Sequence, residues 1–450
     1  MAQNRQDMGS GPVKPLLLQL MIPAVVAQVV NLLYNIVDRI YIGHIEGIGA
    51  AALTGVGLFA PILMLLNAFA MLIGAGGAPR TAIALGQGNK NEAEKIIGNS
   101  FTMLLFFAVV LTAGFYAGAP ALLRLFGASD ATLPYAVAYG RIYILGSVFV
   151  LLVMGMNPFI TTQGFAKISM LTTVIGAVIN IILDPILIFG IGIFPAMGIR
   201  GAAVATVAGY LLSMILAFAL LLGKKQKVQV KIKDFHLKKQ MIYRIFAFGL
   251  PSFIMNALSS FVVTFVNLFL VAYSDTAIAF FGAYFKVQQL IVMTVNGLIQ
   301  GCLPVMRFNY GAGNSERLHS AFRYGTVLVT GMMILGTLAV LLFPAQILEL
   351  FTASEAMRSF GISAMRIMAA SYLFCGLSTM ISTYFQTTEK VGSSMAIQLC
   401  RQMLFLVPAL WCLDKLFQLN GIWLAFPVAE TATLLVALVM MAWHRRKNIS

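Results

Sequence analysis

The chain has 450 residues, of which 60% are hydrophobic and 10% are charged, and its mean hydropathy is +0.90. This composition excludes a soluble globular protein and indicates an integral membrane protein, because apolar runs of about 20 residues recur along the whole length. The formal net charge of +15 would suit a nucleic-acid surface, but the positive residues gather between the apolar runs. That distribution is typical of membrane orientation, so we expect a lipid bilayer and no nucleic acid as partner.

Twelve membrane-spanning helices are predicted. The first 14 residues lack the apolar core of a cleaved signal peptide, so the first apolar run is expected to remain as a helix. Turn and charge clusters place the spans at 16–42, 50–76, 96–118, 133–156, 168–190, 200–222, 244–272, 277–302, 320–342, 360–384, 391–412 and 420–443. We therefore expect an all-α polytopic membrane protein.

The spans fall into two groups of six. The predicted organisation is an N-terminal lobe at 1–222, a basic cytoplasmic linker at 223–243, a C-terminal lobe at 244–443 and a cytoplasmic tail at 444–450. Most of the 30 lysines and arginines share one side with both termini, whereas the opposite loops carry Arg124, Arg200, Arg358 and Lys415. Since Lys and Arg concentrate in cytoplasmic loops, both termini are predicted to be cytoplasmic. The linker's basic run either marks that face or binds anionic lipid.

The two halves of the chain are similar to each other. GAPRTAIALGQGN, which ends at Asn89, aligns with CLPVMRFNYGAGN, which ends at Asn314, at an offset of 225 residues. The same offset places LFGASD at 125–130 on LFTASE at 350–355. Because each half has an even number of spans, both halves enter the membrane from the same side. We therefore predict an internal parallel repeat, which in transporters brackets a central cavity.

Acidic residues within the spans are rare, and only Asp38, Asp184 and Glu430 lie there. An ionisable group at membrane depth costs several kcal/mol unless it is paired or hydrated, so each of the three is a functional candidate. In the first span, the polar residues Gln28, Asn31, Asn35 and Asp38 step by three, four and three positions, which places them on one helix face with Tyr34 alongside.

In the fifth span, Asn180 and Asp184 are i, i+4 neighbours. One interpretation is a buried hydrogen-bond network that ties two helices together. The other is a coupling-ion site, because desolvated carboxylates close to each other can take up a proton near neutral pH.

The second half of the chain provides an internal comparison. Val266 stands at the position equivalent to Asp38, and Val407 at the position equivalent to Asp184. If the fold required the acids, both halves would be expected to have them. Because the acids occur only in the first half of the chain, they favour the coupling-ion interpretation.

These features together resemble the multidrug and toxic compound extrusion (MATE) transporters, in particular the bacterial multidrug pumps. The resemblance rests on the six-plus-six duplication, the loops GQGN and GAGN, Asp38 placed 15 residues after Pro23, NIILDP at 180–185, and GIRGAAVAT at 198–206. It covers essentially the whole chain. It implies the MATE fold, the bacterial plasma membrane and a proton or sodium site at Asp38, Asn180, Asp184 and Thr206.

Substrate contacts are less well defined by the sequence. Gln163, Asn157 and Gln288 are candidate polar contacts, and the many Met and Phe residues would suit a deformable aromatic site for organic cations. Glu430 either attracts cationic substrates or forms a buried ion pair with Arg401. No metal is expected beyond a possible sodium ion at Asp38, Asn180 and Asp184, and neither a cofactor nor an obligate protein partner is expected.

The resulting hypothesis is a secondary antiporter that exports lipophilic organic cations against protons or sodium by alternating access, with the first helix bending near Pro23. The alternative is a flippase for a lipid-linked precursor. A membrane enzyme such as a prenyltransferase is not expected, because no span carries clustered acids of the DxxxD type. The drugs carried, the coupling ion and the oligomeric state are not specified by the sequence.

Overall fold

The computed structural model describes residues 8–126, 128–221, 223, 228, 235, 237–351 and 354–447, and these residues form helices joined by short connections, without any strand. Most of the basic linker predicted at 223–243, and residues 448–450 of the predicted tail, lie outside the described residues.

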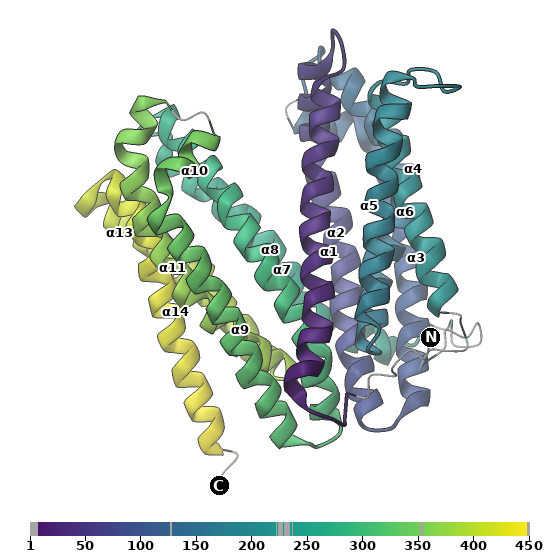
Figure 1. Cartoon of the computed structure of the whole chain (residues 1–450), viewed down its shortest axis with the longest axis vertical. Helices are drawn as coiled ribbons and strands as arrows, with labels where there is room; N and C mark the ends of the chain where they lie inside the picture. The colour runs from purple at the N-terminus through teal and green to yellow at the C-terminus, as the bar shows by residue number, and fades with distance from the viewer. Residues whose placement is uncertain are drawn as a thin grey trace. The chain divides into compact units, whose positions relative to one another are not determined.

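The helices follow one another with few irregular residues between them (Figure 1). In chain order they are α1 (Val13–Gly43), α2 (Gly49–Gly86), α3 (Lys90–Leu125), α4 (Leu133–Thr162), α5 (Ala166–Phe189), α6 (Ile199–Leu221), α7 (Lys239–Leu270), α8 (Asp275–Gly311), α9 (Ser315–Leu342), α10 (Pro344–Leu350), α11 (Glu355–Thr387), α12 (Val391–Leu399), the π-helical segment η2 (Cys400–Phe405), α13 (Leu406–Phe417) and α14 (Leu419–Lys447).

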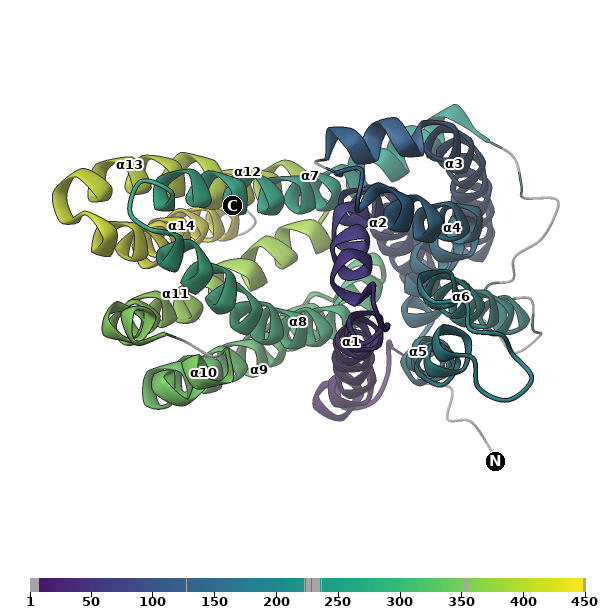
Figure 2. The ribbon, with the colours of Figure 1, turned by 90° about the horizontal axis from the view of Figure 1, so that it is seen from above.

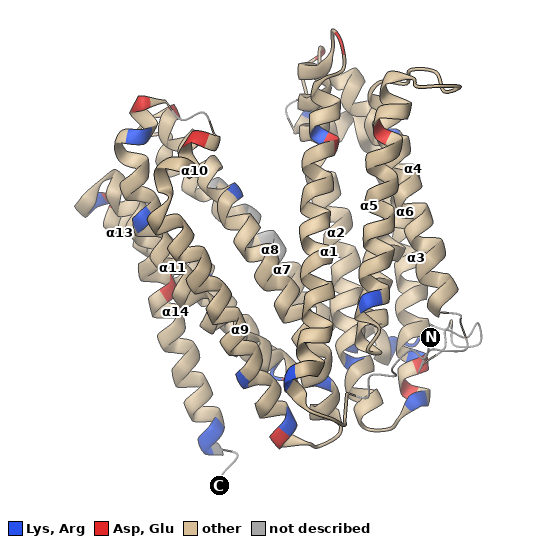
Figure 3. Ribbon diagram, in the orientation of Figure 1, with Lys and Arg blue, Asp and Glu red and all other residues tan. Residues whose placement is uncertain are grey.

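The predicted fold class is confirmed. Eleven helices within the described residues are long and apolar enough to cross a membrane, with Val391–Phe417 counted as one span. The helix α7, which has 32 residues, corresponds to the remaining predicted span. Charged residues lie mostly near the helix ends, and long uncharged stretches separate them (Figure 3).

The repeated GxGN sequence forms the same turn in both halves. Gly88 has a φ of +74° and Gly313 a φ of +71°, a left-handed conformation that favours glycine. The asparagine that follows each glycine then caps the next helix. Asn89 accepts a hydrogen bond from the backbone N–H of Glu92 at 3.1 Å, and Asn314 accepts one from Arg317 at 3.1 Å.

The chain divides into two compact units. Unit 1 comprises Met1–Gly11, Ile22–Phe253 and Gly311–Gly313, and unit 2 comprises Pro12–Met21, Ile254–Tyr310 and Asn314–Ser450. Two of the passages between the units lie well inside a helix, one in α1 and one in α7. Both passages lie within a few residues of a proline, Pro23 in α1 and Pro251 in α7. Because proline removes one backbone hydrogen bond from a helix, these are points where a helix bends easily.

Glycines at equivalent positions of the two halves allow close packing against the N-terminal parts of α7 and α1. In unit 1, a Cβ on Gly76 of α2 would lie 2.1 Å from the carbonyl oxygen of Ile245 of α7. In unit 2, a Cβ on Gly301 of α8 would lie 2.4 Å from Cα of Met21 of α1. Gly76 and Gly301 are separated by the repeat offset of 225 residues. Close backbone approach at a small residue is the usual mode of helix packing in membranes.

Unit 1 is organised around α4. The helix α4 packs against α2, α3 and α6, and α5 packs against α6 (Figure 2). Small residues permit this density, since Ala202 and Ala203 of α6 are fully buried in the same apolar cluster as Phe59 of α2 and Ile144 of α4. This packing brings the polar faces of α4, α5 and α6 together.

Candidate functional site

The fifth and sixth helices supply three polar side chains that contact one another. The side-chain nitrogen of Asn180 donates to Oδ1 of Asp184 at 3.3 Å and to the hydroxyl of Thr206 at 3.2 Å. The Thr206 hydroxyl in turn donates to the carbonyl of Ala202 at 2.9 Å. Asp184 is 0% exposed and Asn180 is 2% exposed. The two predicted positions on α5 and the predicted threonine on α6 therefore form one buried group.

Asp38 of α1 joins this group. Its carboxyl is close enough to that of Asp184 for each to affect the charge of the other, and its side chain is buried. Oδ1 of Asp38, Oδ1 of Asn180 and Oδ2 of Asp184 are buried and have no hydrogen-bond donor among the described residues. Three buried oxygens without donors are costly in a medium of low dielectric constant. Such a group can be satisfied by an added proton or by a cation.

Tyrosines lie around the acids, and only one of them, Tyr34, was predicted from the sequence. The hydroxyl of Tyr34, one turn before Asp38, lies 3.1 Å from that of Tyr210 of α6. Tyr139 and Tyr143 of α4 are buried and stack with ring centroids 5.9 Å apart. Tyr139 lies within electrostatic range of both Asp38 and Asp184.

Spacing could have revealed these missed tyrosines. Each of the four helices contributes a pair of residues four apart, which share a helix face. The pairs are Tyr34 and Asp38, Tyr139 and Tyr143, Asn180 and Asp184, and Thr206 and Tyr210.

Asn35 differs from its neighbours on α1. Its side chain is exposed, and its Nδ2 donates to the carbonyl of Asn31 in the same helix at 2.6 Å. Arg39 is also exposed and forms no ion pair with Asp38 within the described residues. The buried group therefore uses the Tyr34 and Asp38 face of α1, and Asn35 lies beside that face.

Two of the predicted substrate residues have structural contacts in unit 1. Asn157 of α4 donates to the carbonyl of Ser169 at 3.3 Å and to the hydroxyl of Thr173 at 3.2 Å, which ties α4 to α5. Gln163 follows α4, is 1% exposed, and accepts a hydrogen bond from the backbone N–H of Val228 at 2.9 Å. Neither contact involves the acidic group.

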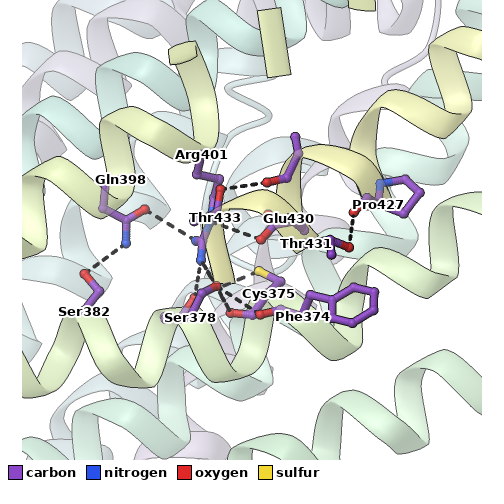
Figure 4. Close-up of polar contacts among 12 residues, drawn as sticks. Phe374, Cys375, Ser378, Ser382, Gln398, Arg401, Pro427, Glu430, Thr431 and Thr433 are labelled. Atoms are coloured by element: carbon purple, nitrogen blue, oxygen red, sulfur yellow. Dashed lines mark hydrogen bonds and ion pairs between the residues drawn. The ribbon is translucent and has the colours of Figure 1, made fainter. Parts of the chain in front are cut away.

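The other two lie in unit 2. Gln288 is half-buried on α8. Glu430 of α14 forms an ion pair with Arg401 of η2, with Nε and Oε2 3.2 Å apart (Figure 4). Arg401 also donates to the hydroxyls of Ser378 at 2.6 Å and Thr379 at 3.1 Å on α11. Of the two interpretations of Glu430, the pair with Arg401 is the arrangement in the structure.

Twelve spans in two similar halves, with an acidic group buried at membrane depth in one half, form the architecture of a membrane transporter. The MatE family model matches the chain at residues 23–186 and 251–411, one match in each half. The chain therefore belongs to the MATE family of transporters.

Curated relatives match along nearly the whole length. The multidrug export protein MepA of Staphylococcus aureus (strain N315) is 26% identical over 435 residues, covering 96% of this chain and 94% of that protein. A FAD transporter of Shewanella oneidensis is 23% identical over 428 residues, covering 95% and 94%. These two relatives are named for different kinds of cargo.

Solved structures have the same fold. An outward-facing multidrug resistance MATE family transporter of the MOP superfamily superimposes with a TM-score of 0.88 at 24% identity, covering 99% of this chain and 98% of that one. A MOP superfamily transporter from Pyrococcus furiosus has a TM-score of 0.88 at 25% identity with the same coverage. A MATE structure described as being in the bent conformation gives 0.89 at 24% identity, again covering 99% and 98%.

Proposed function

We propose that this chain is a secondary active antiporter that exports lipophilic organic cations in exchange for protons. The observation that carries the proposal is the group formed by Asp38, Asn180 and Asp184, in which three buried oxygens have no donor among the described residues. Two neighbouring buried carboxylates repel each other, so uptake of a proton is favourable there. Loss of this proton restores a negative charge that attracts a cation.

The exchange follows from competition for this charge. Protonation of Asp38 or Asp184 removes the negative charge that holds an organic cation in unit 1. A bound organic cation in turn disfavours protonation, and the coupling free energy is the same in both directions. Tyr139 and Tyr143, which are buried on α4, supply aromatic faces of the kind that bind organic cations. The relative named as a multidrug export protein supports this class of cargo.

Alternating access is proposed to use the two proline sites. The chain passes between the units beside Pro23 in α1 and beside Pro251 in α7. Bending at these positions would allow each unit to move as a body while both helices stay continuous. Both termini are proposed to be cytoplasmic in a bacterial plasma membrane, which the distribution of Lys and Arg supports.

Transport by purified protein in proteoliposomes tests the proposal. Ethidium movement would be followed under separately imposed proton and sodium gradients, with FAD as the alternative cargo. We expect a proton gradient to drive ethidium transport by the wild type and by Asp130→Asn, a control in which the acid is exposed at the surface. Asp38→Asn and Asp184→Asn are expected to abolish it.

Three other transport results would change or overturn the proposal. Proton-driven transport that persists in both Asp38→Asn and Asp184→Asn would overturn the assignment of the coupling site. Transport that responds only to sodium would replace the proton with sodium at the same oxygens, which are ligands that a hard cation accepts. Transport of FAD without ethidium would overturn the proposed cargo.

A further inference from the structure

A groove of about 680 Å³ lies in unit 2 between the start of α1 and the start of α9. Its lining residues are Lys14, Leu17, Leu18, Glu316, His319, Ser320, Arg323, Tyr324, Val327 and Leu328. None of these residues is part of the acidic group in unit 1 or of the ion pair between Arg401 and Glu430.

The residues that line the groove form a polar part and an apolar part, which follow one another along the axes of α1 and α9. The helices α1 and α9 are the first and ninth spans, so both enter the membrane from the same side. Polar residues line the groove over the first turns, and apolar residues follow further along each helix, with Leu17 after Lys14 on α1 and Val327 after Arg323 on α9. At 1.5 Å per residue, Val327 lies about 6 Å beyond Arg323 along the helix axis.

The two cations of the groove are available to a ligand. Lys14 and Arg323 are exposed, and neither has an ion-pair or hydrogen-bond partner among the described residues. Tyr324, which is 40% exposed, lies at the boundary between the polar and apolar parts. Tyrosine is enriched at this level of a bilayer, because its ring is apolar and its hydroxyl is polar.

We propose that this groove binds one anionic phospholipid, with the phosphate beside Lys14 and Arg323 and the upper part of an acyl chain along Leu18, Val327 and Leu328. Basic pockets between membrane helices recognise anionic lipid head groups in this way. The cations disfavour an organic cation as the occupant. The apolar half distinguishes a lipid from a free anion, since free phosphate gains nothing from that surface.

Glu316 gives the proposal a second, opposite test. It lines the same groove and is exposed in the first turn of α9, two turns before Arg323. Its carboxylate repels a phosphate, so the proposal requires that removing this charge strengthens binding. A groove whose occupancy depended on shape alone would not respond in that direction.

Native mass spectrometry of the full-length protein in detergent measures this binding. The probes are phosphatidylglycerol, phosphatidylcholine with the same acyl chains, and inorganic phosphate. We expect phosphatidylglycerol to bind more tightly than phosphatidylcholine, and inorganic phosphate not to compete at the same concentration. Lys14→Gln or Arg323→Gln should each weaken phosphatidylglycerol binding about fivefold, and the double variant about 30-fold.

Two variants serve as controls. Lys167→Gln removes an exposed lysine at the start of α5, outside the groove, and is expected to leave the affinity unchanged. Glu316→Gln is expected to raise it. Equal affinity for the two lipids, displacement by inorganic phosphate, or equal losses in Lys167→Gln and Arg323→Gln would each overturn the proposal. Because both lipids are compared within each variant, a general loss of folding cannot imitate the expected result.

Discussion

The ion pair between Arg401 and Glu430 allows a quantitative prediction for unit 2. The side chains of Arg401 and Glu430 are only 13% and 14% exposed, and the charged atoms are 3.2 Å apart. At this distance of 3.2 Å and an effective dielectric constant of about 20, the attraction is about 5 kcal/mol. Removing one partner leaves the other charge buried without compensation, which typically costs about 3–5 kcal/mol.

Two substitutions by methionine, whose side chain is apolar and of broadly similar volume, test this prediction. Arg401→Met and Glu430→Met should each lower the free energy of unfolding by about 3–5 kcal/mol. The double variant should return close to the wild-type value, because an apolar pair replaces an ion pair whose desolvation is expensive. Titration of the detergent-solubilised protein with SDS, followed by circular dichroism, gives the free energies for this double-mutant cycle.

The same variants separate the two interpretations of Glu430. If the pair only holds α14 to η2 and α11, the double variant is expected to keep ethidium transport together with its stability. A role for Glu430 in attracting substrate predicts a stable double variant that transports poorly. Single variants as stable as the wild type, or a double variant as unstable as the single variants, would show that neither buried charge depends on its partner.

Three further predictions concern packing and hydrogen bonds. Gly301→Leu should displace the start of α1 from unit 2, because a Cβ would already lie 2.4 Å from Cα of Met21, and a lower thermal midpoint of unfolding would show it. Tyr210→Phe removes the 3.1 Å contact with the Tyr34 hydroxyl and should cost about 1 kcal/mol in unfolding titrations. Asn157→Leu leaves the Thr172 and Thr173 hydroxyls without their amide partner and should cost about 1–3 kcal/mol, whereas a residue that served only substrate binding would leave the unfolding free energy unchanged.

The sequence predicted the fold class and the acidic group for a simple physical reason. Acids are so costly in apolar spans that Asp38 and Asp184 stood out, and Asn180 followed from helical spacing, whereas Thr206 was implied only by the resemblance to MATE transporters. Tyrosine carries no such penalty, since it is common at membrane boundaries. Tyr139, Tyr143 and Tyr210 were therefore missed, although each lies four residues from another member of the site.

Other features depend on tertiary packing and have no local signal. The passage of α1 into unit 2 before Pro23 rests on the approach of Met21 to a glycine in α8, far away in the sequence. The π-helical segment Cys400–Phe405, which carries Arg401, interrupts a span that hydropathy describes as one continuous helix. Such segments are stabilised by side-chain contacts around them, and they occur frequently at functional sites.

We propose that Asp38 and Asp184 exchange protons for an organic cation, and the number of protons released on binding tests this exchange most directly. Calorimetric titration with tetraphenylphosphonium, repeated in buffers of different ionisation enthalpy, counts the protons released on binding. We expect proton release by the wild type and by Asp130→Asn, and none by the double variant Asp38→Asn with Asp184→Asn. Equal proton release by the wild type and the double variant would contradict it.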